Sequence, residues 1–252
     1  MKLTKNQIAL WAAAVGIGEI SALMRKRLYW SVDERGLLFP GQPEVIGLLA
    51  LTVIAVVFIL ALVRPLAGSD RYEDNFGPSG PSALGHFLLA AGILATAVLE
   101  APKMGGYLGL CWQVLGHVAP VCLVAAGIAR LRGKQPFFLL HLAVCLYFVF
   151  HVVNQYRSWS GNPQLLDYLF ALFGSIALIL FSYYQTAFDV DTGKRRPMLV
   201  WGFLGIYLCL VNLAKTEYPL VYVGGVLWIV SNLCSLTPKP IPEDKGEPHD
   251  PA

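Results

Sequence analysis

Long apolar runs separated by short polar segments extend along almost the whole chain. Eight such runs cover residues 8–24, 45–63, 83–99, 108–129, 137–153, 165–188, 198–214 and 219–235. A helix of about 20 residues, rising about 1.5 Å per residue, crosses a hydrocarbon layer of roughly 30 Å. Since that layer holds no water, each run must satisfy its backbone hydrogen bonds internally, as a helix does. The pattern predicts an all-α protein, a polytopic transmembrane helix bundle of about eight spans.

Two of these regions allow a second interpretation. The first run follows basic residues, as in a signal peptide, but Glu19 interrupts it and the basic segment 25–27 follows it. We therefore expect an uncleaved span. The last two runs are separated only by residues 215–218, so a single re-entrant hairpin is an alternative there.

The polar segments predict a single domain followed by a tail. We expect residues 1–235 to form the transmembrane helical bundle. Residues 236–252 are rich in proline and charge, which predicts a disordered cytoplasmic tail. No loop is long enough for a globular catalytic domain, and the sequence contains no P-loop.

Composition excludes an ordinary soluble domain. The chain is 56% hydrophobic and 14% charged, with a mean hydropathy of +0.58. Soluble domains are about 45–50% apolar and about 25% charged. The five cysteines lie in apolar runs without a CxxC pair, which favours buried thiols over a disulfide framework or zinc site. The expected partner is therefore the lipid bilayer, and no nucleic-acid partner is expected.

The distribution of Lys and Arg predicts the orientation. With the amino terminus in the cytoplasm, 12 of the 19 basic residues fall on the inner side. The positive-inside rule favours this arrangement, although the first outer loop is itself basic. We expect a multi-pass protein of the cell membrane with both termini in the cytoplasm.

Polar residues within the runs concentrate in the predicted outer half. Such residues are costly in a membrane, so they commonly pair or serve a function. Many are spaced i,i+3 or i,i+4 and so share a helix face. The pattern predicts an outward-facing polar pocket. Its candidate ligand-binding residues are Glu19, Glu100, Lys103, Gln113, His117, His151, Asn154, Arg157, Asn212 and Lys215.

A purely structural interpretation stays open. Glu100 and Lys103 can form a local ion pair, and side chains near helix ends can extend to the interface. Glu19 and His117 are the strongest candidates, because they lie furthest from the span ends. The inner half contains fewer polar residues, and they look more dispersed: His86, His141, Gln185 and Asn232.

No cofactor or metal is expected. Two histidines, His117 and His151, match only loosely the paired axial ligands of haem. Together with Glu19 and Glu100 they have the right chemistry for a metal, but they lack a ligand-spacing motif. No catalytic residue can be named from the sequence.

Three segments carry a resemblance to other proteins. They begin at Tyr29, Asn154 and Ala187 and read YWSVDERGLL, NQYRSW and AFDVDTGKRR. They resemble segments of uncharacterised multi-pass membrane proteins of Gram-positive anaerobic bacteria. The resemblance extends over most of the chain and implies a bacterial plasma membrane, but it implies no activity.

Three functional hypotheses follow. The first is a transporter-like protein that binds or moves a small polar solute through the outward-facing pocket. The second is a sensor or assembly subunit that docks onto a partner membrane protein or another copy of itself, using the small residues Ala14, Gly18 and Ala22. The third, less favoured, is a lipid-modifying enzyme in which His117 or His151 is the base and a carboxylate orients it.

Overall fold

A computed structural model describes residues 5–29, 42–66, 68–100, 106–159 and 165–236. Lys103 and nearly all of the predicted tail lie outside these residues. The helices are α1 (Lys5–Trp11), the π-helix η1 (Ala12–Ile17), α2 (Gly18–Leu28), α3 (Pro43–Val63), α4 (Tyr72–Asn75), α5 (Gly80–Glu100), α6 (Gly106–Leu131), α7 (Phe138–Trp159), α8 (Leu165–Phe188), α9 (Arg195–Asn212) and α10 (Pro219–Cys234).

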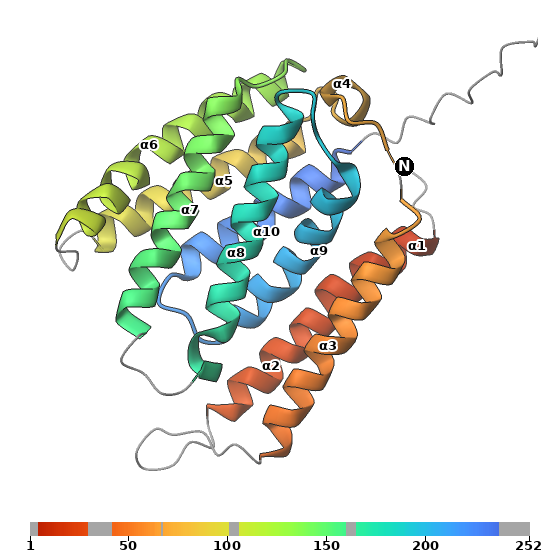
Figure 1. Cartoon of the computed structure of the whole chain (residues 1–252), viewed down its shortest axis with the longest axis vertical. Helices are drawn as coiled ribbons and strands as arrows, with labels where there is room; N and C mark the ends of the chain where they lie inside the picture. The colour runs from red at the N-terminus through yellow and green to blue at the C-terminus, as the bar shows by residue number, and fades with distance from the viewer. Residues whose placement is uncertain (1–4, 30–41, 67, 101–105, 160–164, 237–252) are drawn as a thin grey trace, which may run out of the picture.

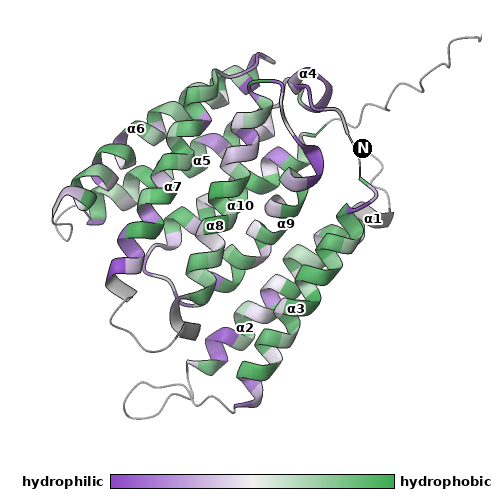
Figure 2. Ribbon diagram, in the orientation of Figure 1, coloured by the Kyte–Doolittle hydropathy of each residue, from purple (hydrophilic) through white to green (hydrophobic). Residues whose placement is uncertain are grey.

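The all-α fold is confirmed. Over the described ranges the structure contains no named strand, only an isolated antiparallel bridge between Phe76 and Leu236. Among these residues, six helices are long and apolar enough to cross a membrane, so the chain is an integral membrane protein by length and composition. The apolar helix α10 is shorter, and the count of eight spans stays a prediction. Apolar residues dominate the long helices, and polar residues gather at α4 and at helix ends (Figure 2).

Helices α5 to α10 form a closed six-helix bundle. Each helix packs against the next one along the chain, and α10 packs back against α5. Figure 1 shows α6, α7 and α8 in front of α5, α10 and α9. Short connections join antiparallel neighbours. The start of α5, the end of α6 and the start of α7 therefore lie at the same end of the bundle, and the later helices continue this alternation. The end beside α4 is called the α4 end here, and the other the far end.

Glycines allow α5 and α10 to close this bundle. A Cβ atom on Gly92 would lie 2.5 Å from the carbonyl oxygen of Leu220, and one on Gly224 would lie 3.0 Å from the Cα of Leu89. These are backbone atoms, which cannot rotate away as side chains do. Close backbone approach at small residues is a common way for membrane helices to associate.

The first two long helical segments, the continuous run α1–η1–α2 and α3, lie outside the bundle and attach to it mainly through α9. Helices α2 and α3 both pack against α9 and against each other. The hydroxyl of Tyr207 on α9 lies 2.8 Å from that of Thr52 on α3 and donates to Ser21 on α2 at 3.2 Å. Helix α9 is therefore covered on most sides, which explains why its buried residues are not confined to one stripe.

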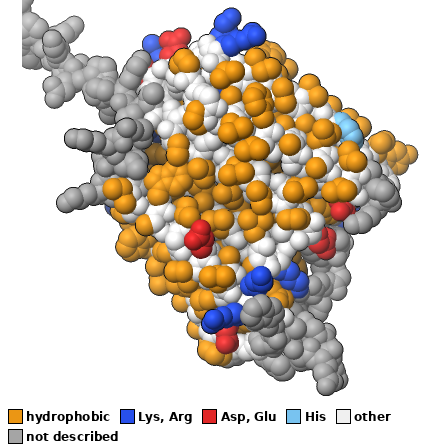
Figure 3. All heavy atoms as spheres, turned by 180° about the vertical axis from the view of Figure 1, so that it is seen from behind, with side chains coloured by type: hydrophobic (Ala, Val, Ile, Leu, Met, Phe, Trp, Pro, Cys, Tyr) orange, Lys and Arg blue, Asp and Glu red, His pale blue; other side chains and the backbone are white. Residues whose placement is uncertain are grey.

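The molecular surface agrees with a lipid environment. Seen from behind, it is covered largely by hydrophobic side chains, with Lys and Arg near the upper and lower edges (Figure 3). Large exposed apolar residues include Val53, Val57 and Phe58 on α3 and Val121 on α6. Contiguous apolar surface of this kind would be an aggregation hazard in water but is the expected lipid contact in a membrane.

We predict that Gly92→Ala lowers the free energy of unfolding by roughly 1–3 kcal/mol, because the added methyl group must push α10 away from α5. Denaturant unfolding of the detergent-solubilised protein measures this change. Gly80→Ala on the same helix is the control, since a Cβ there meets nothing within 4 Å. Equal stability of the two variants would contradict the proposed close packing.

Candidate functional site

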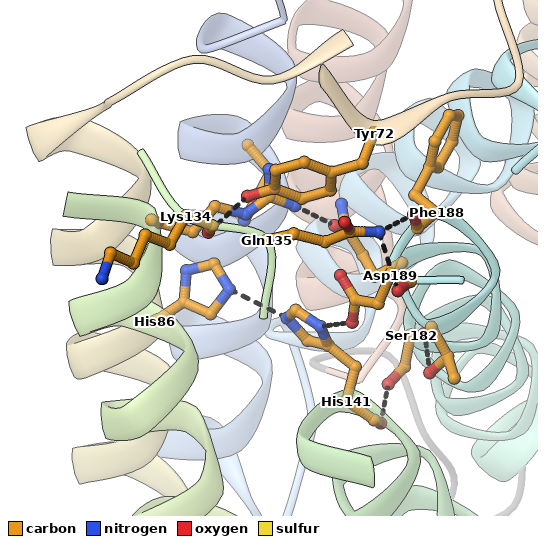
Figure 4. A network of polar contacts seen from close by, with 12 residues as sticks. Tyr72, His86, Lys134, Gln135, His141, Ser182, Phe188 and Asp189 are labelled. Carbon is orange, nitrogen blue, oxygen red and sulfur yellow. Dashed lines mark hydrogen bonds and ion pairs between the residues drawn. The ribbon is translucent and has the colours of Figure 1, made fainter. Parts of the chain in front are cut away.

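A row of titratable side chains occupies the bundle interior near the α4 end (Figure 4). His86 extends from α5 and His141 from α7, and both are 0% exposed. Asp189 directly follows α8 and is 7% exposed. The helices bring these three residues together although they are far apart in the sequence.

Hydrogen bonds join the three groups end to end. The Nδ1 atom of His86 lies 2.7 Å from the carbonyl oxygen of Ser82. Its Nε2 atom lies 3.1 Å from Nε2 of His141, and Nδ1 of His141 lies 2.5 Å from Oδ2 of Asp189. Every ring nitrogen of the pair is therefore used, and we call this arrangement the His–His–Asp row.

Neighbouring polar groups fix the backbone around the row. Ser182 donates to the carbonyl oxygen of His141 at 3.0 Å, and Ser82 donates to Asn232 at 3.0 Å. The exposed side chain of Gln135 donates to the carbonyl oxygen of Asp189 at 2.9 Å. These bonds satisfy carbonyl groups and hydroxyls at the bundle end, where unpaired polar groups would be costly.

A buried cation lies beside the row. Arg130 of α6 is 1% exposed and donates from Nη2 to Oε1 of Gln185 at 2.6 Å. Its guanidinium group lies 3.7 Å from the ring centroid of Phe76 and 4.7 Å from that of Tyr72. It also interacts electrostatically with Asp189. Aromatic faces and a nearby carboxylate thus compensate for burial of the charge.

Helix α4 covers this end of the bundle. Tyr72 donates from its hydroxyl to the carbonyl oxygen of Lys134 at 3.2 Å, and its amide donates to Asp191 at 2.8 Å. The rings of Phe76 and Phe188 meet edge to face at 5.3 Å. Burial raises the pKa of the Tyr72 phenol, the nearby Asp189 raises it further, and Arg130 opposes this. The phenol therefore stays protonated at neutral pH.

A second polar cluster lies in the far half of the interior. His151 of α7 is buried and accepts a hydrogen bond at Nδ1 from the indole of Trp112 at 3.3 Å. Its ring stacks on Tyr147 and meets Tyr218 edge to face. Tyr222 lies 2.8 Å from Ser175 between their hydroxyl oxygens. We call these residues the His151 cluster.

The sequence-predicted site residues divide into two groups. Several come near the far end of the bundle: His151 belongs to the cluster, Gln113 lies next to Trp112 on α6, and the charge of Glu100 acts on Tyr218. Burial, Glu217 and Glu100 raise the pKa of Tyr218 to about 12. Asn154 and Arg157 follow His151 on α7, where both have interacting partners.

The other predicted residues lie elsewhere. Glu19 on α2 and His117 on α6 have exposed side chains, and Nδ1 of His117 bonds to the carbonyl oxygen of Gln113 one turn earlier. Asn212 is buried and accepts a hydrogen bond from Arg25 at 3.1 Å, between α9 and α2. Lys215 lies over the ring of Tyr29 at 3.9 Å. These four residues do not line the bundle interior with His151.

The expectation of dispersed inner-half residues is wrong. His86 and His141 are hydrogen-bonded to each other, Gln185 binds Arg130, and Asn232 binds Ser82. They looked dispersed because sequence position gives depth in the membrane but not the direction a helix face points.

Arg130 and Asp189 were missed as site residues because both lie at helix ends and resemble loop charges. One sequence pattern does point to Asp189. Ser175, Ser182 and Asp189 recur every seven residues, so they share one face of a helix, and Gln185 lies close to that face.

The row runs in a line and does not converge on a point. No group of three or more His, Cys, Asp or Glu residues that could hold a metal ion occurs within the described part of the chain. The chemistry that the geometry allows is hydrogen bonding and proton exchange among the imidazoles and the carboxylate. No family model matches the sequence, and neither a curated protein nor a solved structure matches it.

We predict that Arg130→Leu destabilises the protein by about 3 kcal/mol or more, because it leaves the buried groups that face the cation, Gln185 and Asp189, without it. Arg132→Leu removes an exposed charge two residues later and should change stability by less than about 0.5 kcal/mol. The thermal midpoints of the two purified variants test this difference. A similar midpoint for both would show that the buried cation does not stabilise the fold.

Proposed function

We propose that this integral membrane protein binds or moves a small polar solute through the interior of the six-helix bundle, entering from the far end. The observation that carries the proposal is the His151 cluster. It provides hydrogen-bonding groups deep in an otherwise apolar bundle, and two of its members keep unused capacity.

Those members are His151 and Tyr147. The indole of Trp112 can only donate, so Nδ1 of His151 accepts and a neutral ring carries its proton on Nε2. Within the described residues, neither Nε2 of His151 nor the buried hydroxyl of Tyr147 has a hydrogen-bond partner. Buried polar groups normally have partners, so two unused groups on successive turns of α7 favour a polar ligand.

The residues near the mouth suit a polar solute. We propose that Glu100, Gln113, Asn154 and Arg157 contact it on entry, with Lys103 nearby in the sequence, and that Asn212 and Lys215 stabilise the neighbouring α2–α9 interface. We also propose that the α4 end faces the cytoplasm of a bacterial cell, because Arg64, Arg71, Arg132 and Lys134 lie in or beside its connections.

Assembly with another membrane protein is the second candidate. Glu19 and His117 expose ionisable side chains within two of the candidate membrane spans. Such groups are unfavourable in lipid and favour a polar partner helix. Crosslinking in native membranes distinguishes the candidates, since a stoichiometric partner protein lost in Glu19→Gln would support assembly.

We predict that at least one small polar solute raises the thermal midpoint of the detergent-solubilised protein, and that His151→Ala abolishes this shift. A panel of amino acids, sugars, carboxylates and quaternary amines provides the probes. A solute at 100 times its dissociation constant stabilises the folded state by about 2.7 kcal/mol. The shift should persist in His117→Ala, whose histidine lies on the outside of the bundle.

Two results would contradict the solute-binding proposal. One is a panel in which no solute shifts the wild-type midpoint. The other is a shift that survives in His151→Ala and in Tyr147→Phe, because the ligand would then bind away from the cluster. A shift lost in His117→Ala and kept in His151→Ala would instead indicate a site on the outer surface of α6.

A further inference from the structure

The hydrogen bond between His86 and the carbonyl oxygen of Ser82 determines where the protons of the His–His–Asp row lie. The carbonyl oxygen of Ser82 can only accept, so Nδ1 of His86 carries a proton. One proton must then lie between the two Nε2 atoms, and one between His141 and Asp189. Two facing lone pairs at these distances would repel. The row therefore holds three protons.

Those three protons have three arrangements that satisfy the hydrogen bonds, of which one is an ion pair of an Asp189 carboxylate with an imidazolium at His141 and a neutral His86. The other two place the charge-determining proton at opposite ends of the row. In one, Asp189 is a neutral acid that donates to Nδ1 of His141, and Nε2 of His141 donates to Nε2 of His86. In the other, Asp189 is a carboxylate that accepts from Nδ1 of His141, and His86 is an imidazolium that donates to Nε2 of His141. Both arrangements satisfy every hydrogen bond with the rings as they stand.

We propose that His86, His141 and Asp189 form a proton relay that carries a proton from the α4 end into the bundle interior. The O–H bond at Oδ2 of Asp189 breaks as an N–H bond forms at Nδ1 of His141. The N–H bond at Nε2 of His141 breaks as one forms at Nε2 of His86. The proton count does not change, and one positive charge appears on His86 while one negative charge appears on Asp189.

Charged and aromatic groups surround both ends of the row. Arg130 interacts electrostatically with both ends of the row: it attracts a negative charge on Asp189 and repels a positive charge on His86. Tyr72 is the other titratable group that acts on the Asp189 end, and it stays neutral at ordinary pH. At the inner end the rings of His86 and Trp228 lie nearly perpendicular with their centroids 5.8 Å apart.

The ends of the row differ in access to the surface. The side chains of His141 and Asp189 are both 0% exposed, but the backbone of Asp189 reaches the surface, where its carbonyl oxygen accepts a hydrogen bond from the exposed side chain of Gln135. Asp189 is thus the end of the row that lies nearest the surface, and the proposed relay takes up its proton at this end. One atom of this buried carboxylate, Oδ1, has no partner among the described residues and can accept an incoming hydrogen bond.

The relay does not depend on the proposed solute, and nitrogen NMR of the protein in lipid nanodiscs tests it directly. The chain contains only five histidines, so ¹⁵N-histidine labelling gives few signals, and single substitutions assign them. We expect Nε2 of His86 and both nitrogens of His141 to show shifts between those of protonated and unprotonated nitrogen. His151 is the internal reference, since its bond from Trp112 fixes one tautomer when the ring is neutral.

Two substitutions should stop the exchange. In Asp189→Asn the side chain can form a hydrogen bond with His141 but cannot transfer a proton, so both rings should settle into fixed tautomers. In His86→Gln the proton on Nε2 of His141 has no second imidazole to which it can move, so Nε2 of His141 should settle as a protonated nitrogen. Glu19→Gln, which changes an exposed carboxylate on α2, should leave all relay signals at their wild-type positions.

Two outcomes would overturn the relay. The first is a wild-type spectrum in which His86 and His141 each hold fixed protons, a result that needs no variant to fold. The second is intermediate shifts that persist in both Asp189→Asn and His86→Gln, because exchange would then not pass along the row. Neither outcome bears on solute binding at the His151 cluster, so failure of one proposal is distinguishable from failure of the other.

Discussion

A hydrocarbon environment offers no hydrogen-bond partners, so most buried polar groups of this protein pair with one another inside it. This constraint explains the two-part interior of the six-helix bundle. At the α4 end the histidines, Arg130 and Asp189 are joined in one connected set. At the far end the buried polar groups are hydroxyls, an indole and one imidazole, which form hydrogen bonds with one another and carry fewer charges. Leu89, Ile93 and Leu178 are among the buried apolar side chains of the helices that connect the two ends.

The same constraint shows why most of the fold could be predicted and most of the site could not. Helices follow from apolar runs, since a helix is the way for a single segment to satisfy its backbone in lipid. The direction of a side chain depends on its neighbours, which the runs do not reveal. His86 and His117 are both lone histidines in apolar runs, yet His86 lies in the interior and His117 is exposed. Of the predicted pocket, His151 lies in the interior, whereas Glu19 is exposed.

Helix α9 illustrates a different limit of sequence patterns. Its apolar run predicts a membrane span, but α9 is not among the six helices of the described ranges that are long and apolar enough to cross a membrane, and it is buried on most sides by α2, α3, α8 and α10. A helix surrounded by protein can be apolar for the same reason as one surrounded by lipid. Only the packing distinguishes the two, and it also shows that α9 is the element through which α2 and α3 attach to the bundle.

The backbone contact between the segment after α4 and the residue after α10 couples these two elements mechanically. Phe76, which follows α4 and lies against the guanidinium of Arg130, forms a backbone bridge with Leu236 just beyond α10. The amide of Gly193 also donates to Asp70, before α4. The cover over Asp189 is therefore tethered to the last helix as well as to the α8–α9 connection. A shift of α10 along its axis would therefore move that cover. The position of α10, which reaches the far end of the bundle, is in this way coupled to solvent access at the α4 end.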